Sequence, residues 1–311
     1  MKGQVYKSTG NWYHVKLSTG EFINARILGI FRLDNLRTTN PIAVGDIVTI
    51  TLENQDYLIT EIEKRENYII RESPKNRTAR HILASNIGQV CIMASLIKPR
   101  TSTGFIDRCL VTAAAYNIPA FIVFNKSDLN RSKENQLLEK LISIYKDAAV
   151  KTIATSIFDE GSMLRFSTLL SNKSTLLIGH SGVGKSTLIN KIDHNLDLKT
   201  GEISEVHDKG KHTTTFTEMF DLVMGGSIID APGIKEFGLL DIEKYELSRY
   251  FPEMMRLLPQ CKFNNCLHVS EPDCAILKAL QTGIISEVRY QNYLNMLDDM
   301  EDSVENWELK K

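Results

Sequence analysis

GHSGVGKS, residues 179–186, has the pattern G-x-x-x-x-G-K-S of a phosphate-binding loop. The apolar run Ser174 to Ile178 precedes it, and a predicted helix begins at Ser186. In this setting the loop glycines let backbone N–H groups point at phosphate oxygens, and the helix N-terminus adds the positive end of its dipole. The stretch therefore predicts an α/β nucleotide-binding domain of the P-loop type.

The residues of this loop have separate expected tasks. Lys185 would reach the β- and γ-phosphates, and the hydroxyl group of Ser186 would ligate Mg²⁺. The loop residues that we expect to contact the nucleotide are Gly179, Ser181, Gly182, Val183, Gly184, Lys185, Ser186 and Thr187.

A guanine-type motif, Asn125-Lys126-Ser127-Asp128, stands before the phosphate loop. It follows the apolar run Ala120 to Phe124, so it lies at the carboxyl end of a predicted strand, where parallel sheets bind ligands. The Asp128 carboxylate can accept hydrogen bonds from N1–H and the exocyclic amine of guanine, which adenine does not offer, while Asn125 and Lys126 would brace the loop and pack on the base. An ordinary GTPase runs phosphate loop, switches, then guanine motif. The reversed order predicts a circularly permuted GTPase domain.

Two other predicted strand ends carry nucleotide-binding residues. Thr155 and Ser156 would form the second guanine loop, although they depart from the usual Ser-Ala-Lys. In the sequence D-A-P-G that begins at Asp230, the carboxylate would hold Mg²⁺ through water and the N–H of Gly233 would bind the γ-phosphate. Ile234 occupies the position at which Ras-like enzymes place a water-orienting glutamine, so intrinsic hydrolysis should be slow unless another group assists.

The polar stretch between the phosphate-loop helix and Asp230 should contain the first switch, and the sequence HTTT there begins at His212. Thr214 would cap Mg²⁺ and the γ-phosphate, which makes Ser186, Thr214 and Asp230 the expected Mg²⁺ ligands. His212 could orient or deprotonate the attacking water, and the alternative is an inert surface histidine. The expected catalytic set is therefore His212, Lys185 and Thr214.

The pattern of apolar residues divides the chain into three predicted domains. Residues 1–66 contain short alternating strands punctuated by Gly20 and Gly45, which favours a small β-barrel with an oligonucleotide-binding (OB) fold. A generic small β domain without a ligand is the alternative. Residues 67–240 alternate strand and helix, as a permuted GTPase domain with a parallel sheet requires, and residues 241–311 are mainly helical.

The stretch from 65 to 81 is the most basic in the chain. It carries Arg65, Arg71, Lys75, Arg77, Arg80 and His81 against Glu66 and Glu72. Charge alone permits either a solvated linker or a patch that contacts RNA phosphates beside the barrel.

The overall composition is that of a soluble globular protein, with 311 residues, 42% of them apolar and 24% charged. The formal net charge is −1, so no global field attracts the chain to nucleic acid. No apolar run reaches the roughly 18 residues of a membrane span, and the N-terminus lacks the apolar segment of a signal peptide. We therefore expect a cytoplasmic protein without membrane contact. We also expect it to be a monomer.

The C-terminal part contains a cluster with the spacing C-x₄-C-x-H-x₅-C, made of Cys261, Cys266, His268 and Cys274. Three thiolates and one imidazole suit a tetrahedral Zn²⁺, and the crowding of three of the five cysteines late in the chain indicates a metal rather than disulfides. Buried free cysteines are the alternative. Cys91 and Cys109 lie in apolar strand and helix contexts and are interpreted as core thiols.

Together, the reversed motif order, the β-rich N-terminal segment and the Cys/His spacing resemble the RsgA (YjeQ) family of circularly permuted GTPases over nearly the whole chain. The GKHTTT stretch, Gly210 to Thr215, matches the family's first switch, in which the histidine is regarded as catalytic, so the resemblance assigns that role to His212. The hydrophobic Ile234 also fits the family. His180 in the phosphate loop and Ala231 in the second switch motif depart from it.

The resemblance implies an OB-fold barrel, a permuted GTPase domain and a mainly helical zinc-binding domain. It implies a GTPase that binds the small (30S) ribosomal subunit and its 16S rRNA in the GTP form and acts in late maturation of that subunit. The subunit would stimulate hydrolysis of GTP to GDP and phosphate, and GDP formation would release the protein. The implied cofactors are Mg²⁺ with GTP and one structural Zn²⁺.

Three other functions stay open at this point. A permuted GTPase of the large subunit would share the GTPase core, but the barrel and the Cys/His cluster argue against it. An RNA-binding scaffold would hold GTP without subunit-stimulated turnover. An ATP-driven P-loop enzyme conflicts with Asp128, and competition between GTP and ATP would decide the matter.

Overall fold

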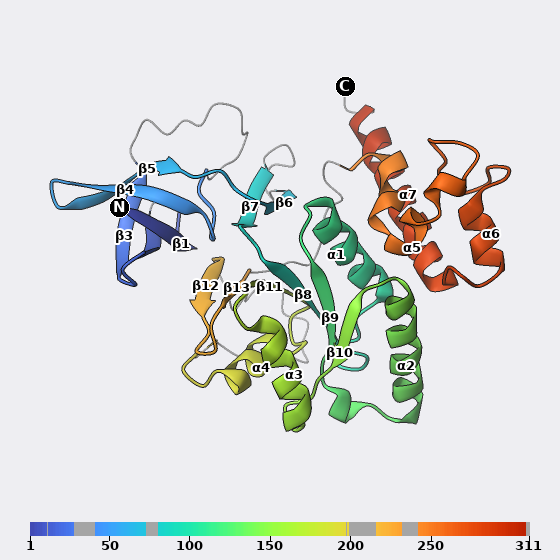
Figure 1. Ribbon diagram of the computed structural model, residues 1–311, viewed down its shortest axis with the longest axis horizontal. Coiled ribbons are helices and arrows are strands. Elements are labelled where there is room, and N and C mark those ends of the chain that lie inside the picture. Colours follow the sequence, from blue (N-terminus) through green and yellow to red (C-terminus); the bar gives the residue numbers. More distant parts are fainter. Residues whose placement is uncertain are drawn as a thin grey trace.

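The strands of the GTPase domain form one end of an 11-stranded sheet, and the N-terminal strands form its other end (Figure 1). The computed structural model describes residues 1–10, 12–27, 41–72, 80–196, 198, 216–231 and 242–308. The strands run in the spatial order β10-β9-β8-β11-β13 and are parallel, and β12 pairs antiparallel with β13. Their bounds are β8 Gln89–Ala94, β9 Ala120–Phe124, β10 Lys151–Ala154, β11 Ser174–Ile178, β12 Glu218–Asp221 and β13 Ser227–Asp230.

Helices cover both faces of this sheet, which is why β8 is buried at every position and apolar from Val90 to Ala94. Val90 and Ile92 face a core that contains residues of α1 and α2, while Cys91 and Met93 face a core that contains residues of α3 and α4. The bounds of these helices are α1 Thr103–Ala115, α2 Ser132–Asp147, α3 Glu160–Leu170 and α4 Lys185–Ile192. Cys91 and Cys109 are buried free thiols, as predicted.

The N-terminal strands close into a five-stranded barrel in the order β1-β2-β3-β5-β4, with β1 also pairing with β4. Inward-facing residues such as Val5, Val15 and Ile50 form its core. Alternate residues face outward, so the period of two that the sequence shows is the physical basis of the barrel. The strand bounds are β1 Lys2–Ser8, β2 Tyr13–Leu17, β3 Phe22–Ile27, β4 Ile47–Glu53 and β5 Asp56–Ile62.

The barrel and the GTPase sheet join edge to edge through β1 and β12. Lys7 pairs with Glu218 in this register, and its ammonium group lies 2.8 Å from the Glu218 carboxylate. The Asp221 carboxylate accepts hydrogen bonds from the Tyr6 hydroxyl at 2.6 Å and from the Lys16 ammonium at 2.5 Å. Neither β12 nor this junction is predicted by the pattern of the sequence.

The basic stretch forms a hairpin between barrel and GTPase domain in the part that the structure describes, β6 Tyr68–Glu72 with β7 Arg80–Ser85. Arg65 before it donates to the buried Asp46 carboxylate from Nε and Nη2, each at 2.7 Å. The positive charge of Arg65 is therefore neutralised within the protein by Asp46. Lys75 and Arg77 lie outside the described residues, so whether this stretch contacts RNA stays a prediction.

The C-terminal part is mainly helical, and its elements α7 and η2 pack against α1 (Figure 1). Arg289 of α7 is buried at this contact, where its guanidinium lies 2.5 Å from Asp107 of α1 and 2.7 Å from Glu253 of α5. The bounds are η2 Lys244–Tyr250, α5 Pro252–Met255, η3 Leu258–Gln260, α6 Ala275–Gln281 and α7 Glu287–Glu308. Among the described helices, none has the length and apolar character needed to cross a membrane.

Candidate functional site

The phosphate loop leaves β11 at Gly179 and enters α4 at Lys185. Gly182 and Gly184 have φ angles of 78° and 97°, which side-chain-bearing residues rarely adopt. At Gly184 a Cβ atom would also stand 2.5 Å from the Asn125 side-chain nitrogen, and at Gly179 it would stand 2.6 Å from the Met93 carbonyl oxygen. The glycines of the motif are therefore required by the turn at Gly182 and Gly184 and by the close approach of β8 and of the loop that contains Asn125.

Lys185 lies inside this loop, where its ammonium group donates to the carbonyl oxygens of Gly179 at 2.6 Å and His180 at 3.2 Å. Burial lowers the pKa of Lys185, and the nearby Asp230 carboxylate at the end of β13 opposes the shift. A partly desolvated ammonium interacts more strongly with an anion than one in bulk water. The lysine is thus placed to hold a phosphate group above the loop.

The guanine-type motif contacts the phosphate loop directly. The Asn125 carboxamide nitrogen donates to the Val183 carbonyl at 3.0 Å, and the Lys126 ammonium donates to the Gly182 carbonyl at 2.7 Å. Lys126 also donates to the Lys98 carbonyl at 2.7 Å, a contact that the sequence analysis missed. These bonds bring the two motifs into one site although the chain order is reversed.

The loop after β10 closes the other side of the same site. The Thr155 hydroxyl donates to the Asn125 side-chain oxygen at 3.0 Å, and the Ser127 N–H donates to the Thr155 carbonyl at 3.1 Å. Thr155 and Ser156 are both buried, whereas the Asp128 side chain is exposed. The structure therefore brings together Asn125, Lys126 and Thr155 and leaves the Asp128 carboxylate accessible at the edge of the sheet.

The other predicted residues of the nucleotide site are located as follows. Ser186 is half-buried in the first turn of α4, and Ser181 and Thr187 are exposed beside it. Asp230 ends β13 in register with Leu177 of β11, next to the strand that leads into the phosphate loop. His212, Thr214 and Gly233 lie outside the described residues, so their predicted roles stay predictions.

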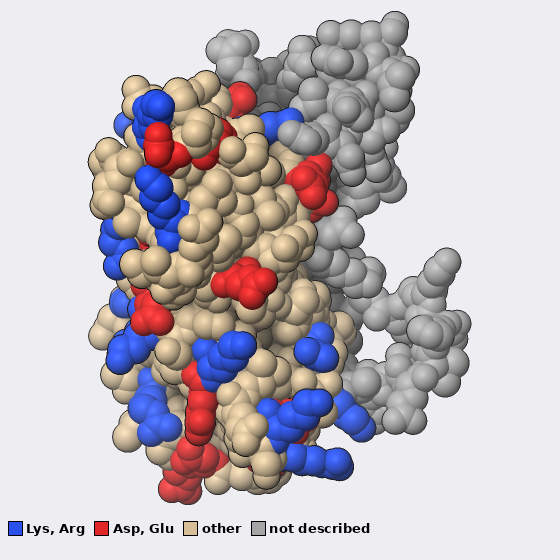
Figure 2. Space-filling view, turned by 90° about the vertical axis from the view of Figure 1, so that its right-hand side faces the viewer, with Lys and Arg blue, Asp and Glu red and all other residues tan. Residues whose placement is uncertain are grey.

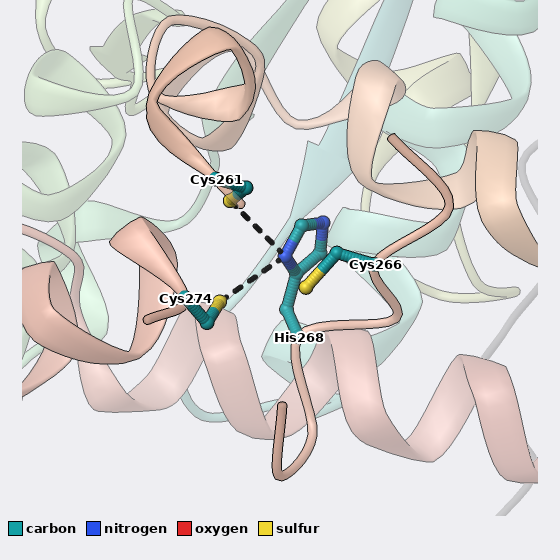
Figure 3. A group of neighbouring side chains, drawn as sticks. All are labelled: Cys261, Cys266, His268 and Cys274. Carbon is teal, nitrogen blue, oxygen red and sulfur yellow. Dashed lines mark hydrogen bonds between the residues drawn. The ribbon is translucent and has the colours of Figure 1, made fainter. Parts of the chain in front are cut away.

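A second candidate site is formed by Cys261, Cys266, His268 and Cys274, whose ligand atoms all lie within 4.8 Å of one another (Figure 3). The Nδ1 atom of His268 is 3.3 Å from the Cys274 sulfur and 3.8 Å from the Cys261 sulfur. Burial lowers the pKa of His268, which favours the neutral imidazole that a metal requires. Burial also raises the pKa of Cys266 to about 12, so metal uptake at this position would release a proton. The donor set and its convergence fit one tetrahedral metal ion.

Groups around this cluster hold the ligands in place, and the sequence analysis did not identify them. The Nε2 atom of His268 is 3.2 Å from the Ser248 hydroxyl, which leaves Nδ1 facing the sulfur atoms. The Tyr290 hydroxyl donates to the His268 carbonyl at 2.7 Å. Burial alone would raise the pKa of Glu271, but backbone N–H donors, among them that of Leu267, lower it to about 2. Ser248 lies in η2, far from the cluster along the chain, so spacing could not have revealed it.

The outer side of β2 and β3 presents aromatic and basic side chains. Trp12 and Phe22 are 44% and 46% exposed. The Arg26 guanidinium lies 4.5 Å from the Trp12 ring centroid, and His14 stacks with Phe22 at 5.8 Å between centroids. Lys16 is 5.9 Å from the centroid of Phe22. Such a surface can stack bases while its cations neutralise phosphates.

The right-hand side of Figure 1, where α2, α6 and α7 lie, is a different face of the molecule. Figure 2 shows Lys and Arg side chains mixed with Asp and Glu over its described part, with neither sign covering the face. The net charge of −1 is consistent with this mixture.

Comparison with known proteins places the whole chain in one family. Residues 62–240 match the family model "RsgA GTPase", and residues 2–57 match "RsgA N-terminal domain". The chain is 46% identical over 307 residues to the small ribosomal subunit biogenesis GTPase RsgA of Christiangramia forsetii, covering 97% of this chain and 98% of that protein. It is 48% identical over 303 residues to the small ribosomal subunit biogenesis GTPase RsgA 2 of Bacteroides thetaiotaomicron, with coverage of 97% and 98%.

Two solved structures of similar proteins support the same family assignment. YjeQ from Thermotoga maritima superposes with a TM-score of 0.78 at 31% identity, covering 96% of this chain and 97% of that one. YloQ, described as a circularly permuted GTPase, superposes with a TM-score of 0.74 at 27% identity, covering 97% and 95%. These matches confirm the fold class predicted from the sequence, a barrel, a permuted GTPase domain and a helical Cys/His region. The chain belongs to the RsgA family of circularly permuted GTPases of small ribosomal subunit biogenesis.

Proposed function

We propose that this protein binds GTP with Mg²⁺ and, in the GTP-bound state, binds the small (30S) ribosomal subunit during late maturation of the subunit. The subunit then stimulates hydrolysis of GTP to GDP and phosphate, after which the protein leaves the subunit. The observation that carries the proposal is the set of bonds from Asn125 and Lys126 to the phosphate loop, because it joins the guanine-type motif to that loop although the order of the motifs is permuted. The relatives' names, which describe biogenesis of the small ribosomal subunit, support the choice of partner.

In the proposed site the base is read by Asp128, and the phosphates lie on the loop that begins at Gly179. The proposed nucleotide contacts are Asn125, Lys126, Asp128, Thr155, Ser156, Gly179, Ser181, Gly182, Val183, Gly184, Lys185, Ser186, Thr187, Asp230 and Gly233. Ser186, Thr214 and Asp230 would hold Mg²⁺, which supplies charge neutralisation at the β- and γ-phosphates. Lys185 and Thr214 would stabilise the γ-phosphate, and His212 would orient or deprotonate the attacking water.

The Cys/His cluster would hold one structural Zn²⁺, with Cys261, Cys266, His268 and Cys274 as its four ligands. A closed set of four protein ligands leaves no open coordination position, so the ion would stabilise a fold rather than take part in hydrolysis. We place the domain boundaries near residues 66 and 240, with the zinc-binding domain at 241–311.

We propose that the 16S rRNA of the subunit is contacted in part by the outer side of β2 and β3. Trp12 and Phe22 are exposed there, and Arg26 lies against the indole ring. Exposed aromatic rings with adjacent cations bind unpaired nucleotides by stacking and charge neutralisation. The protein would act in the cytoplasm as a monomer.

Co-sedimentation with purified small ribosomal subunits tests this function. The protein is mixed with subunits and either a non-hydrolysable GTP analogue or GDP, and the pelleted fraction is measured at two salt concentrations. We expect strong pelleting with the analogue and weak pelleting with GDP. Equal pelleting in both nucleotide states, or preference for large subunits, would contradict the proposal. A Trp12→Ala, Phe22→Ala double variant should pellet less while still binding GDP.

A further inference from the structure

Phe158 has the most exposed side chain among the large apolar residues of the described part of the chain, at 79%. An exposed phenyl ring of this kind forgoes the stabilisation that burial in the core would give. Its position follows the second guanine loop directly, three residues beyond Thr155. A ligand that covered the ring would account for its exposure.

The backbone around Phe158 is held rigidly. Its N–H donates to the Ser156 hydroxyl at 3.2 Å, and the N–H of Asp159 donates to the Ser156 carbonyl at 3.1 Å. Ser156 is itself buried and is bonded to Ser162, whose hydroxyl donates to the Ser156 carbonyl at 3.2 Å. Asp159 then caps α3 by accepting from the Gly161 N–H at 3.0 Å. The exposed ring therefore stands on a fixed loop.

This loop lies beside the base-reading motif. Strands β9 and β10 are neighbours, with Ala154 in register with Phe124, so the loops that follow them leave the same edge of the sheet. The bonds from Thr155 to Asn125 and from Ser127 to Thr155 tie the two loops together. Phe158 and Asp128 thus lie on adjoining loops at the site proposed for guanine.

A guanine base needs both an edge partner and a surface for its flat faces. Asp128 supplies acceptors for the edge, and the alkyl chain of Lys126, held by its bonds to Gly182 and Lys98, can cover one face. A phenyl ring is the side chain that best covers the other face, because offset stacking of aromatic rings adds to area burial. We propose that Phe158 stacks on the guanine base and contributes to nucleotide affinity. This inference rests on the proposed guanine-nucleotide site.

The test compares the affinities of GDP and of ribose 5-diphosphate, which lacks the base, in wild type, Phe158→Ala, Phe158→Trp and Leu164→Ala. Leu164 on the adjoining α3 is the matched control, since it is an apolar side chain 69% exposed. We expect Phe158→Ala to weaken GDP binding about 5-fold or more, as loss of one base–aromatic stack does, and to leave ribose 5-diphosphate unchanged. Phe158→Trp should retain GDP affinity, and Leu164→Ala should bind both ligands as wild type does.

The outcomes separate this inference from the function on which it rests. If the wild type binds GDP and Phe158→Ala binds it with the same affinity, the stacking role is overturned and the proposed function stands. Equal losses for GDP and ribose 5-diphosphate would also overturn it, because they would show a general disturbance of the loop. A wild-type protein without measurable affinity for GDP would overturn the proposed function and this inference together.

Discussion

The Lys126 ammonium group lies 2.7 Å from the carbonyl oxygen of Gly182, a residue 56 positions further along the chain. In the reversed motif order the guanine loop precedes the phosphate loop, yet this bond places the two loops against each other. The site is therefore determined by the positions of the strands in the sheet and not by their order in the chain. Both β9 and β11 lie next to β8, so the loops that follow them are close together. A permuted chain can build the same site because the loops leave the same sheet edge.

Replacing Lys126 with methionine should weaken GDP binding about tenfold or more. The substitution keeps most of the alkyl chain but removes the donor that bonds both Gly182 and Lys98, and bonds to charged groups contribute about 1.5–3 kcal/mol. Equilibrium titration with a fluorescent GDP analogue measures the change. Lys140→Met, on an exposed position of α2, is the matched control and should bind normally. Identical affinities in the two variants would refute the bracing role.

Replacing Asp128 with asparagine should change which base the site accepts. The carboxylate can only accept hydrogen bonds, as guanine N1–H and its amine require, whereas an asparagine amide also donates and suits the C2 carbonyl of xanthine. We expect GDP affinity to fall about 100-fold or more while xanthosine diphosphate becomes the better ligand. Competition binding with both diphosphates checks this. A variant that loses GDP without gaining the xanthine nucleotide would argue against base reading by Asp128.

Breaking the ion pair between Asp107 and Arg289 should destabilise the contact between α1 and α7. Both side chains are buried, and Asp107→Ala removes one of the two carboxylates that Arg289 contacts while Glu253 stays as its partner; losing a hydrogen bond to a charged group typically costs about 1.5–3 kcal/mol. Asp299→Ala removes an exposed partner of Arg108 on the same helix pair and should cost at most about 1 kcal/mol. Urea denaturation of both variants gives the comparison. Similar losses would show that burial does not set the strength of this contact.

Removing the Ser248 hydroxyl should weaken metal binding at the Cys/His cluster. Ser248 is bonded to Nε2 of His268 and so favours the form of the ring that presents Nδ1 to a metal. We expect Ser248→Ala to reduce Zn²⁺ affinity about 10- to 100-fold, measured by competition with a chromophoric chelator. Ser270→Ala changes an exposed serine of the same region and should have wild-type affinity. A chain that binds no Zn²⁺ at all would contradict the proposed site.

The elements that the sequence predicted best are those whose pattern is local. The strand Ala120–Phe124 and the polar residue that follows it were evident because an apolar run and a motif stand next to each other. Likewise, the Cys/His spacing alone indicated a cluster that the structure brings within 4.8 Å. Local signals of this kind need no knowledge of distant partners.

What the sequence could not predict depends on contacts between distant residues. Strand β12 has four residues and pairs with β1 through Lys7 and Glu218, which are 211 positions apart. Ser248 reaches His268 from another element, and Arg65 is neutralised by Asp46 rather than exposed in a basic patch. In each case the side chain's role is set by a partner that only the folded chain brings near.

GTP hydrolysis with and without small ribosomal subunits, in wild type and His212→Ala, tests the central claim most directly. We predict slow hydrolysis by the protein alone, because Ile234 replaces the water-orienting glutamine, and a large stimulation by the subunits that His212→Ala abolishes. The variant should still bind GDP, which separates catalysis from binding. If the protein binds GTP but small subunits do not stimulate its hydrolysis, the proposed function is contradicted. That result would favour an RNA-binding scaffold or a role on the large subunit.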